Sequence, residues 1–379
     1  MRRLVALTCA MVLVDTVFYA ALTPLVPYFT GELGLSKSLV GVLSGAFGAG
    51  VLLGSAPGGY LATRLGVRPT AVAGLGLMSV ASLLFGFASG AWELVALRLA
   101  AGFGSALSWV SALTWLTAQT PEERRGQMLG TLGSAAVVGA LLGPALGGVA
   151  ATVGVSLTFA LVCGVGLAVA LWARFTPAPG PSPSGNKPLV AVFAAVFEPR
   201  LATGLLLIGF SPLLFGVLTV LAPLTLSGFG WGAAAIGGVF LVAALFEAAV
   251  HPLLGRWSDR AGYRPPVVAG LLASLAVLIS LPLAPSAPLV ALLVVLAGGA
   301  FNAPLIPGTA LLSRTAESAG IAGALAFGAA NFAWASGYAI GASLGGTLAD
   351  LGGDALSYLS LAAACLLALL LLRRASLST

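Results

Sequence analysis

Three ionisable residues lie inside long apolar stretches of this sequence, and they are its first candidates for chemistry. Asp15 falls in MVLVDTVFYAAL, Arg98 in LVALRLAAG and Glu247 in LVAALFEAAVH. A charge inside a membrane is costly unless it meets a water-filled cavity, a counter-ion or hydrogen-bonding groups. Asp15 is therefore predicted to bind a proton or a cation, with Tyr19 on the same helical face orienting the carboxylate. The alternative role for Asp15 is a structural hydrogen bond.

Glu247 and His251 are four residues apart, and they are the only acid and imidazole pair inside an apolar stretch. Such a pair could take up and release a proton. A neutral Glu247 bonded to His251 near a membrane surface would only contribute to packing, and the sequence leaves both readings open. Arg98 cannot lose its proton, so it needs either an acid or backbone carbonyls as partners.

Polar and aromatic residues also gather in two late apolar stretches. Asn302 lies in the first of them, and Asn331, Trp334 and Tyr338 in the second share one helical face at spacings of three and four. An amide beside two aromatic rings could line a cavity and hold an organic cation partly through cation–π attraction. Packing against neighbouring helices or lipid is the alternative role for the rings.

Enzymatic chemistry finds no support in the sequence. The chain has one His and three Cys, and the cysteines are widely spaced within apolar stretches. No catalytic triad, metal-ligand spacing or phosphate-binding loop can be assembled. We therefore expect no enzyme activity, no cofactor and no metal.

The elements that must position these residues are membrane helices. Of 379 residues, 59% are hydrophobic and only 7% are charged, whereas soluble domains carry about 25% charged residues. Apolar stretches long enough to span a bilayer follow one another along the whole chain. They predict an all-α membrane protein with twelve spans, which begin near residues 4, 39, 69, 92, 126, 155, 201, 232, 265, 287, 320 and 355.

The basic residues predict the orientation. With a cytoplasmic N-terminus, fifteen Lys and Arg residues fall in inside segments, and Lys37 alone falls outside. This asymmetry favours a multi-pass protein of the inner membrane with both termini in the cytoplasm. Because the basic residues are scattered through short loops, we expect no nucleic-acid partner.

The chain divides into two similar halves. The segment TPAPGPSPSGNK predicts a linker over residues 176–200, between six-helix bundles over 1–175 and 201–379. GYLATRLGVRP and GRWSDRAGYRP repeat at an offset of 196, and GPALGG and GASLGG at 198. Parallel six-helix repeats of this kind place a substrate site near the middle of the membrane, at their interface. The residues that match between the first two segments are Gly59, Arg64, Gly66 and Arg68 with Gly255, Arg260, Gly262 and Arg264.

These segments resemble motifs of the major facilitator superfamily over essentially the whole chain. Both repeated loops are similar to the motif that follows span two in that family, with its acid kept as Asp259 but replaced by Thr63 in the first copy. Arg98 and Gly102 match key positions of the span-four motif, which implies a coupling role for Arg98. A further motif, that of proton-coupled drug antiporters, is matched in span five by Gly139, Gly143, Pro144, Gly147 and Gly148. Its small residues let helices approach closely and its proline bends the helix.

Within the superfamily, the sequence is most similar to vesicular amine transporters and their bacterial drug-exporting relatives. DTVFYAALTPLVP aligns with their span-one segment, which places Asp15 on the acid that binds a substrate amine. Four charged groups of these relatives are replaced here, by Phe47, Thr219, Asn302 and Asn331. The same proton mechanism therefore does not carry over directly.

These observations predict a secondary transporter that exports small cationic or amphiphilic organic compounds in exchange for protons, by alternating access and as a monomer. Asp15, Tyr19, Asn302, Asn331, Trp334 and Tyr338 are the expected substrate-binding residues, and Asp15, Arg98, Glu247 and His251 the expected proton-coupling residues. The alternatives are a facilitator or proton symporter for a small metabolite, and a membrane sensor that transports nothing.

Overall fold

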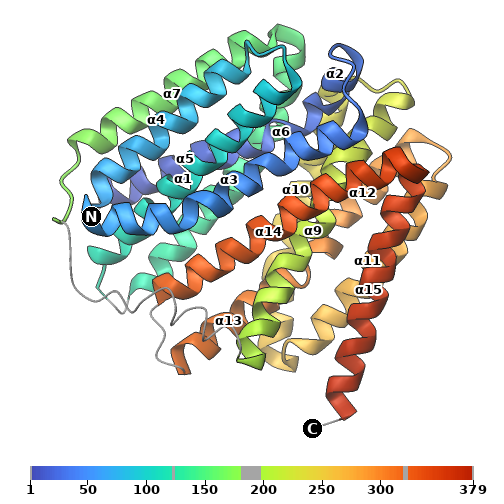
Figure 1. The fold of residues 1–379 in the computed structure, drawn as a ribbon. Coiled ribbons are helices and arrows are strands. Elements are labelled where there is room, and N and C mark those ends of the chain that lie inside the picture. Colours follow the sequence, from blue (N-terminus) through green and yellow to red (C-terminus); the bar gives the residue numbers. More distant parts are fainter. Residues whose placement is uncertain (1, 122–123, 181–197, 319–322, 378–379) are drawn as a thin grey trace. The chain divides into compact units, whose positions relative to one another are not determined.

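The structure is a computed structural model that describes residues 2–121, 124–180, 198–318 and 323–377. Every regular element in these residues is a helix, as Figure 1 shows. In the first part of the chain these are α1 (Arg2–Ala20), η1 (Thr23–Leu25), α2 (Val26–Gly31), α3 (Lys37–Arg64), α4 (Val67–Phe85), α5 (Ala91–Ala118), α6 (Arg125–Val153) and α7 (Val155–Phe175). In the second part they are α9 (Pro199–Gly228), α10 (Ala233–Ala261), α11 (Arg264–Ser280), η3 (Leu281–Leu283), α12 (Ala287–Asn302), α13 (Leu305–Ser318), α14 (Gly323–Gly352) and α15 (Asp354–Leu377).

The predicted all-helical membrane fold is confirmed. Eleven segments of the described chain are long and apolar enough to cross a membrane. The remaining predicted span, the eleventh along the chain, corresponds to α14, which has 30 residues but is richer in Gly, Ala and polar side chains than in Leu or Val. Its length suits a span, and its small residues suit close packing against another helix.

Prolines interrupt two of the spans. Pro24 and Pro27 follow α1, so the first span continues as η1 and α2, and Pro304 separates α12 from α13. A proline lacks the backbone N–H that would continue the helical hydrogen-bond ladder. The carbonyls of the last turn of α1 are therefore left open to other donors.

The chain forms two compact units. The first contains residues 1–28 and 46–188, and the second contains residues 29–45 and 189–379. Helix α3 is thus divided after Gly45. The predicted linker over 176–200 lies largely outside the described residues, so the predicted domain limits stay a prediction.

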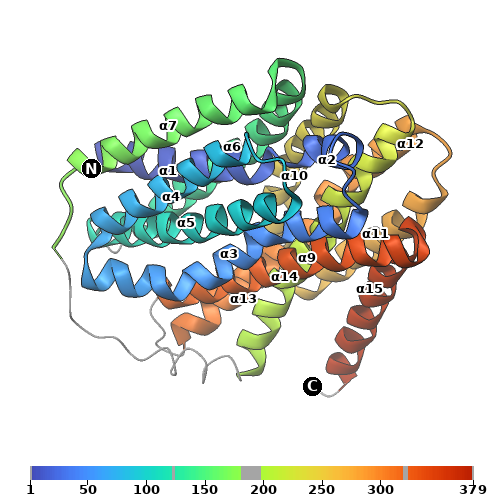
Figure 2. The ribbon, with the colours of Figure 1, turned by 45° about the horizontal axis from the view of Figure 1, so that its top comes forward.

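Within the first unit, helices approach closely at glycines. A Cβ atom on Gly102 of α5 would overlap the carbonyl oxygen of Phe47 on α3. A Cβ atom on Gly139 of α6 would lie 2.7 Å from the carbonyl oxygen of Leu13 on α1. Helix α4 packs against both α5 and α7, and Figure 2 shows these helices running side by side.

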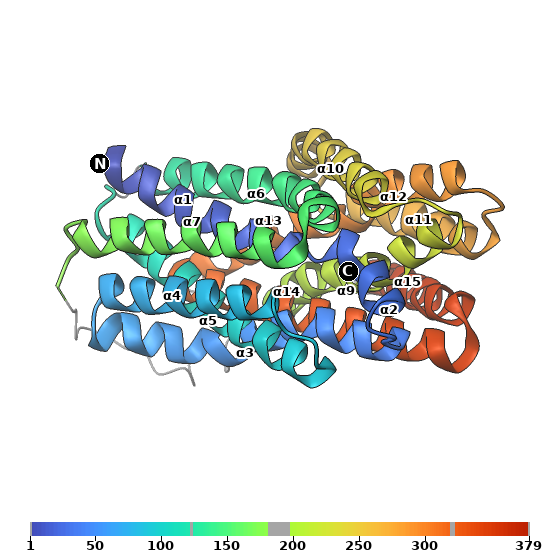
Figure 3. The same cartoon turned by 90° about the horizontal axis from the view of Figure 1, so that it is seen from above.

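The second unit repeats these contacts. Gly298 of α12 faces the carbonyl of Ala243 on α10, and both residues lie 196 positions after their counterparts Gly102 and Phe47. Gly337 of α14 faces the carbonyl of Gly209 on α9, in the manner of Gly139 and Leu13. Helix α11 packs against α12 and α15 (Figure 3), as α4 packs against α5 and α7. The two predicted bundles therefore have the same internal architecture.

Replacing Gly102 by Ala is expected to lower the thermal unfolding temperature of the detergent-purified protein, because α3 would have to move away. Overpacking of this kind costs about 1–3 kcal/mol. Gly76→Ala in α4 is the matched control, since a Cβ atom there has nothing within 4 Å. Helix propensity alone favours Ala over Gly by about 1 kcal/mol. Equal melting shifts in the two variants would contradict the close contact.

Candidate functional site

Asp15 is a buried carboxylate held from a neighbouring helix. Its side chain on α1 is 3% exposed. The indole Nε1 of Trp109 on α5 donates a hydrogen bond of 2.6 Å to its Oδ2 atom, and the hydroxyl of Ser105 lies within reach of the carboxylate. Neither partner was predicted. Both follow Arg98 on one face of α5, at spacings of seven and eleven residues, and this pattern could have revealed them.

Arg98 binds the broken end of α1. Its guanidinium donates to the carbonyl oxygens of Phe18 at 3.1 Å and Tyr19 at 2.9 Å, and it stands 4.8 Å from the ring centroid of Phe47. The last carbonyls of a helix lack partners within it and carry partial negative charge, so a cation there is stabilising. Arg98 was expected to need an acid or backbone carbonyls as partners, and both of these hydrogen bonds go to backbone carbonyls. Its charge also attracts the carboxylate of Asp15.

Tyr19 packs against Phe47, with ring centroids 5.3 Å apart and planes inclined by 43°. The expected arrangement had Tyr19 orienting the Asp15 carboxylate, whereas the hydrogen bond observed on Oδ2 comes from Trp109. Phe47 stands where the resemblance expects a lysine, and it is 2% exposed. At the position where the resemblance expects a second cation, Arg98 thus faces an aromatic ring.

In the second unit, the structure brings Glu247 and His251 together on α10. The Nε2 atom of His251 lies 3.4 Å from a carboxylate oxygen of Glu247, and their side chains are 20% and 27% exposed. This distance is longer than that of a well-formed hydrogen bond. The pair is thus in proximity without a tight ion pair.

Asn302 belongs to the Glu247 group. It is 7% exposed at the end of α12, and its side chain lies within hydrogen-bonding reach of Glu247. Its Oδ1 atom accepts a hydrogen bond of 2.9 Å from Ser211 of α9. Ser211 was not predicted, although it lies 196 residues after Asp15 and so occupies the repeat position of that acid.

Trp334 and Tyr338 form a flat aromatic pair on α14. Their ring centroids are 5.6 Å apart and their planes differ by only 6°. Trp334 packs against an apolar cluster that includes Ile208 and Leu312. Asn331 lies on the same helix one turn earlier and is half-buried. The predicted shared face therefore exists, while its contact with a substrate stays a prediction.

The family of this chain, with its two repeated bundles and buried ionisable groups, is identified by comparison with known proteins. The family model of the Major Facilitator Superfamily matches residues 7–337. The chain belongs to the major facilitator superfamily. It is a multi-pass membrane protein of a transporter family.

Relatives in sequence are also superfamily transporters. Multidrug resistance protein MdtG of Klebsiella pneumoniae (strain 342) is 29% identical over 282 residues, which cover 69% of this chain and 66% of that protein. The uncharacterized MFS-type transporter YcaD of Escherichia coli (strain SE11) is 28% identical over 294 residues, 75% of each chain. The uncharacterized MFS-type transporter Rv1250 of Mycobacterium tuberculosis is 41% identical over 90 residues, 24% of this chain and 16% of that protein. The matches to MdtG and Rv1250 thus span less than two thirds of those relatives.

Solved structures share the fold at low identity. A bacterial homolog of the human lysosomal transporter Spinster matches with a TM-score of 0.76 at 19% identity, over 92% of this chain and 81% of that chain. A D-xylose–proton symporter matches with a TM-score of 0.74 at 19% identity, over 97% and 95%. At such identities the likeness shows the fold alone.

The two loops that resemble the superfamily motif contain glycines with positive φ values, and charged residues at the adjoining helix ends make an ion pair and an aromatic contact. Gly66 and Gly262 have φ values of 97° and 79° at the turns before α4 and after α10, a region that disfavours residues with a Cβ atom. Asp259 pairs with Arg314 of α13 at 3.1 Å. The guanidinium of Arg64 lies 5.5 Å from the ring centroid of Tyr60.

The span-five motif packs α6 onto α1. Gly143 faces Ala20, the last residue of α1, and Gly147 faces Ala21 directly after it, so closely that a Cβ atom on either glycine would overlap them. Pro144 lies within α6 and Gly148 is buried. The predicted close approach of helices at this motif is therefore present within the first unit.

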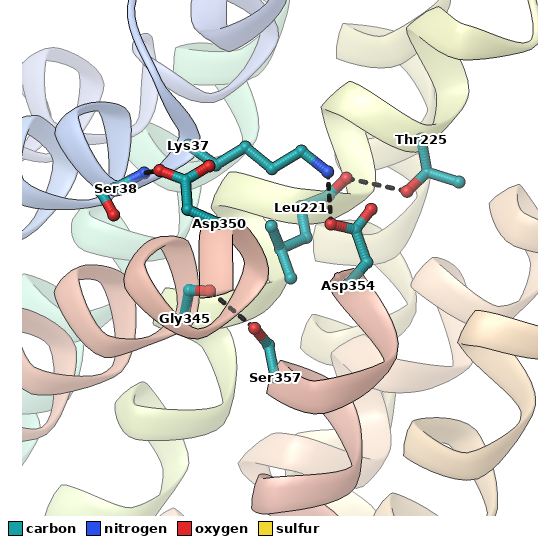
Figure 4. A network of polar contacts seen from close by, with 8 residues as sticks. All are labelled: Lys37, Ser38, Leu221, Thr225, Gly345, Asp350, Asp354 and Ser357. Carbon is teal, nitrogen blue, oxygen red and sulfur yellow. Dashed lines mark hydrogen bonds and ion pairs between the residues drawn. The ribbon is translucent and has the colours of Figure 1, made fainter. Parts of the chain in front are cut away.

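A polar network joins the start of α3 to α14 and α15 (Figure 4). Lys37 Nζ lies 2.5 Å from Asp354 Oδ1, and the backbone N–H of Ser38 donates to Asp350 Oδ2 at 2.8 Å. Lys37, Asp350 and Asp354 border a cavity of about 480 Å³, which Thr225 of α9 also lines. The sequence singled out Lys37 as the one basic residue of the predicted outer segments but missed the two acids. Their position beside the Gly352–Gly353 turn, in another predicted outer segment, was the available signal.

No group of three or more His, Cys, Asp or Glu side chains suited to a metal occurs among the described residues.

The Lys37–Asp354 pair is expected to stabilise the protein more than the Asp259–Arg314 pair. The first pair is 34% and 28% exposed, whereas the second is 70% and 68% exposed. Double-mutant cycles with alanine, read by thermal melting, should give a coupling near the upper end of about 0.2–1 kcal/mol for the first and close to zero for the second. A larger coupling for Asp259–Arg314 would contradict the ranking by burial.

Proposed function

We propose that this chain exports small cationic or amphiphilic organic compounds across the inner membrane, in exchange for protons and by alternating access. Both termini would lie in the cytoplasm. The observation that carries the proposal is Asp15, whose Oδ1 atom is buried without a hydrogen-bond partner among the described residues. A buried carboxylate oxygen with an open acceptor site can take either a proton or an ammonium group.

Exchange follows from competition at this oxygen. Trp109 holds the other carboxylate oxygen in place, so the carboxylate keeps one orientation. If a proton and an organic cation compete for Oδ1, binding of one releases the other, and their movements are coupled in opposite directions. Arg98 would act as the coupling group here, because it binds the end of α1 and its charge attracts the Asp15 carboxylate.

The second unit would supply apolar recognition and a second proton site. The flat faces of Trp334 and Tyr338 suit planar or cationic organic compounds. Asn331 on the same face offers hydrogen bonds for orientation. Glu247 and His251 would bind a proton during the cycle. The efflux direction is supported by the resemblance to MdtG, whose name describes it as a multidrug resistance protein.

A panel of organic cations and neutral metabolites, tested by thermal shift on purified protein, is expected to contain cations that stabilise the parent but not Asp15→Asn. Glu93→Gln, an exposed carboxylate on α5, is the matched control and should keep the response. Stabilisation by neutral metabolites that persists in Asp15→Asn would favour uptake of a small metabolite instead.

Vesicle flux tests the coupling. Efflux of a cation from the panel should increase when an inwardly directed proton gradient is imposed, and it should be strongly reduced in Asp15→Asn. Flux that ignores the proton gradient would contradict antiport. An absence of flux in proteoliposomes that still bind the compound would favour a sensor.

A further inference from the structure

A polar node connects three helices inside the second unit. Asn302 of α12 contacts Ser211 of α9 on one side and Glu247 of α10 on the other. The Ser211 hydroxyl also lies 2.5 Å from the carbonyl oxygen of Phe301. Ser211 is fully buried and Asn302 is 7% exposed. With so little water access, the side chains of this node must satisfy one another.

We propose that Asn302 is a relay that reports the protonation of Glu247 to helix α9, by turning its side-chain amide between two hydrogen-bonded orientations. The proposal rests on the proposed role of Glu247 as a proton site. It changes the expected role of Asn302 from a substrate contact to a positioning residue.

The observed orientation suits an ionised Glu247. The amide nitrogen of Asn302 lies 3.4 Å from the carbonyl oxygen of Gly298, and its other N–H can donate to the Glu247 carboxylate, which only accepts hydrogen bonds. The amide oxygen accepts from the Ser211 hydroxyl at 2.9 Å. Because an amide has donors on one side and an acceptor on the other, the charge on Glu247 fixes which side faces Ser211.

A protonated Glu247 supports the opposite orientation. Its hydroxyl can donate to the amide oxygen of Asn302, and the amide nitrogen can then donate to the Ser211 oxygen. The Ser211 hydroxyl is left to donate to the Phe301 carbonyl, with which it is already in contact. The proton remains on Glu247 throughout. The amide nitrogen gives up its 3.4 Å contact with the Gly298 carbonyl and gains the Ser211 oxygen as its acceptor. Protonation thus changes the bond between α12 and α9.

The side chains at the two ends of the relay differ in their exposed fraction. The side chains of Glu247 and His251 are 27% and 20% exposed, whereas Ser211 and Asn302 are buried. The acid is therefore the more accessible end of the relay, and its effect is passed to two buried residues.

Glu247 and His251 are the only Asp, Glu, His, Lys or Arg residues in the middle of α10 and of the helices packed against it. Helix α10 packs against α9, α11, α12 and α13. The other charged residues of these five helices lie near their ends and are Arg200, Arg256, Asp259, Arg260, Arg264, Arg314 and Glu317.

The internal repeat points to the same node independently. Ser211 occupies the repeat position of Asp15. In the first unit Asp15 on α1 is held from α5, and in the second unit Ser211 on α9 is held from α12. Both polar centres therefore join the first and fourth spans of their repeat. In the second unit the Ser211 hydroxyl takes the place of the acid. The acid of that unit, Glu247, is linked to Ser211 through Asn302.

The test uses infrared spectroscopy of the full-length protein with isotope-labelled asparagine. The chain has three asparagines, at 186, 302 and 331, so the Asn302 side-chain carbonyl is assigned by its loss in Asn302→Leu. In the parent its band should shift reversibly with pH. The shift should disappear in Glu247→Gln and change in size or direction in Ser211→Ala. The band of Asn331 serves as the internal control and should stay constant.

An Asn302 band that does not respond to pH, or that responds equally in Glu247→Gln, would overturn the relay. If Asn302→Leu fails to fold, Asn302→Ser assigns the band in its place. The outcome is independent of the transport assay. Proton-coupled flux with a silent Asn302 band would remove the relay and keep the proposed function. A responsive band in a protein without proton-coupled flux would do the reverse.

Discussion

Close approach of helices at glycines is the constraint on which the rest of the structure depends. Lipid chains are as apolar as Leu side chains, so helices in a membrane associate through dense packing rather than through the exclusion of water. Gly102 against the Phe47 carbonyl, and Gly298 against the Ala243 carbonyl, bring backbones into direct contact. Helix pairs fixed in this way can hold a polar side chain on one helix at a set distance from its partner on the next.

Most hydroxyl groups inside the units bond to carbonyls of their own helix, whereas several larger polar groups use neighbouring helices. Arg98 uses carbonyls that the proline-interrupted end of α1 leaves open, and Trp109 uses its single N–H on Asp15. Ser211 and Asn302 use each other. Such bonds matter more here than in a soluble protein, because the surroundings offer few alternative partners.

The sequence predicted well what depends on a single helix or on the order of helices. Apolar length and basic residues indicated the spans, and spacing by four brought Glu247 and His251 together. It missed partners that lie across helices, including Trp109 for Asp15 and Asp354 for Lys37. Spacing along one chain segment carries no direct information on such contacts. The repeat offset does carry some, since it relates Ser211 to Asp15 before any coordinates are known.

The two copies of the repeat keep their backbone contacts while their side chains diverge. Position 98 is an arginine, and its counterpart 196 residues later is Val294, which is completely buried. The first copy thus carries a permanent cation where the second carries a methyl-bearing side chain of no charge. A duplicated sequence of this kind can keep the backbone contacts of both copies while the side chains of each copy change. Substitutions can therefore alter what one copy recognises without altering the packing of its helices.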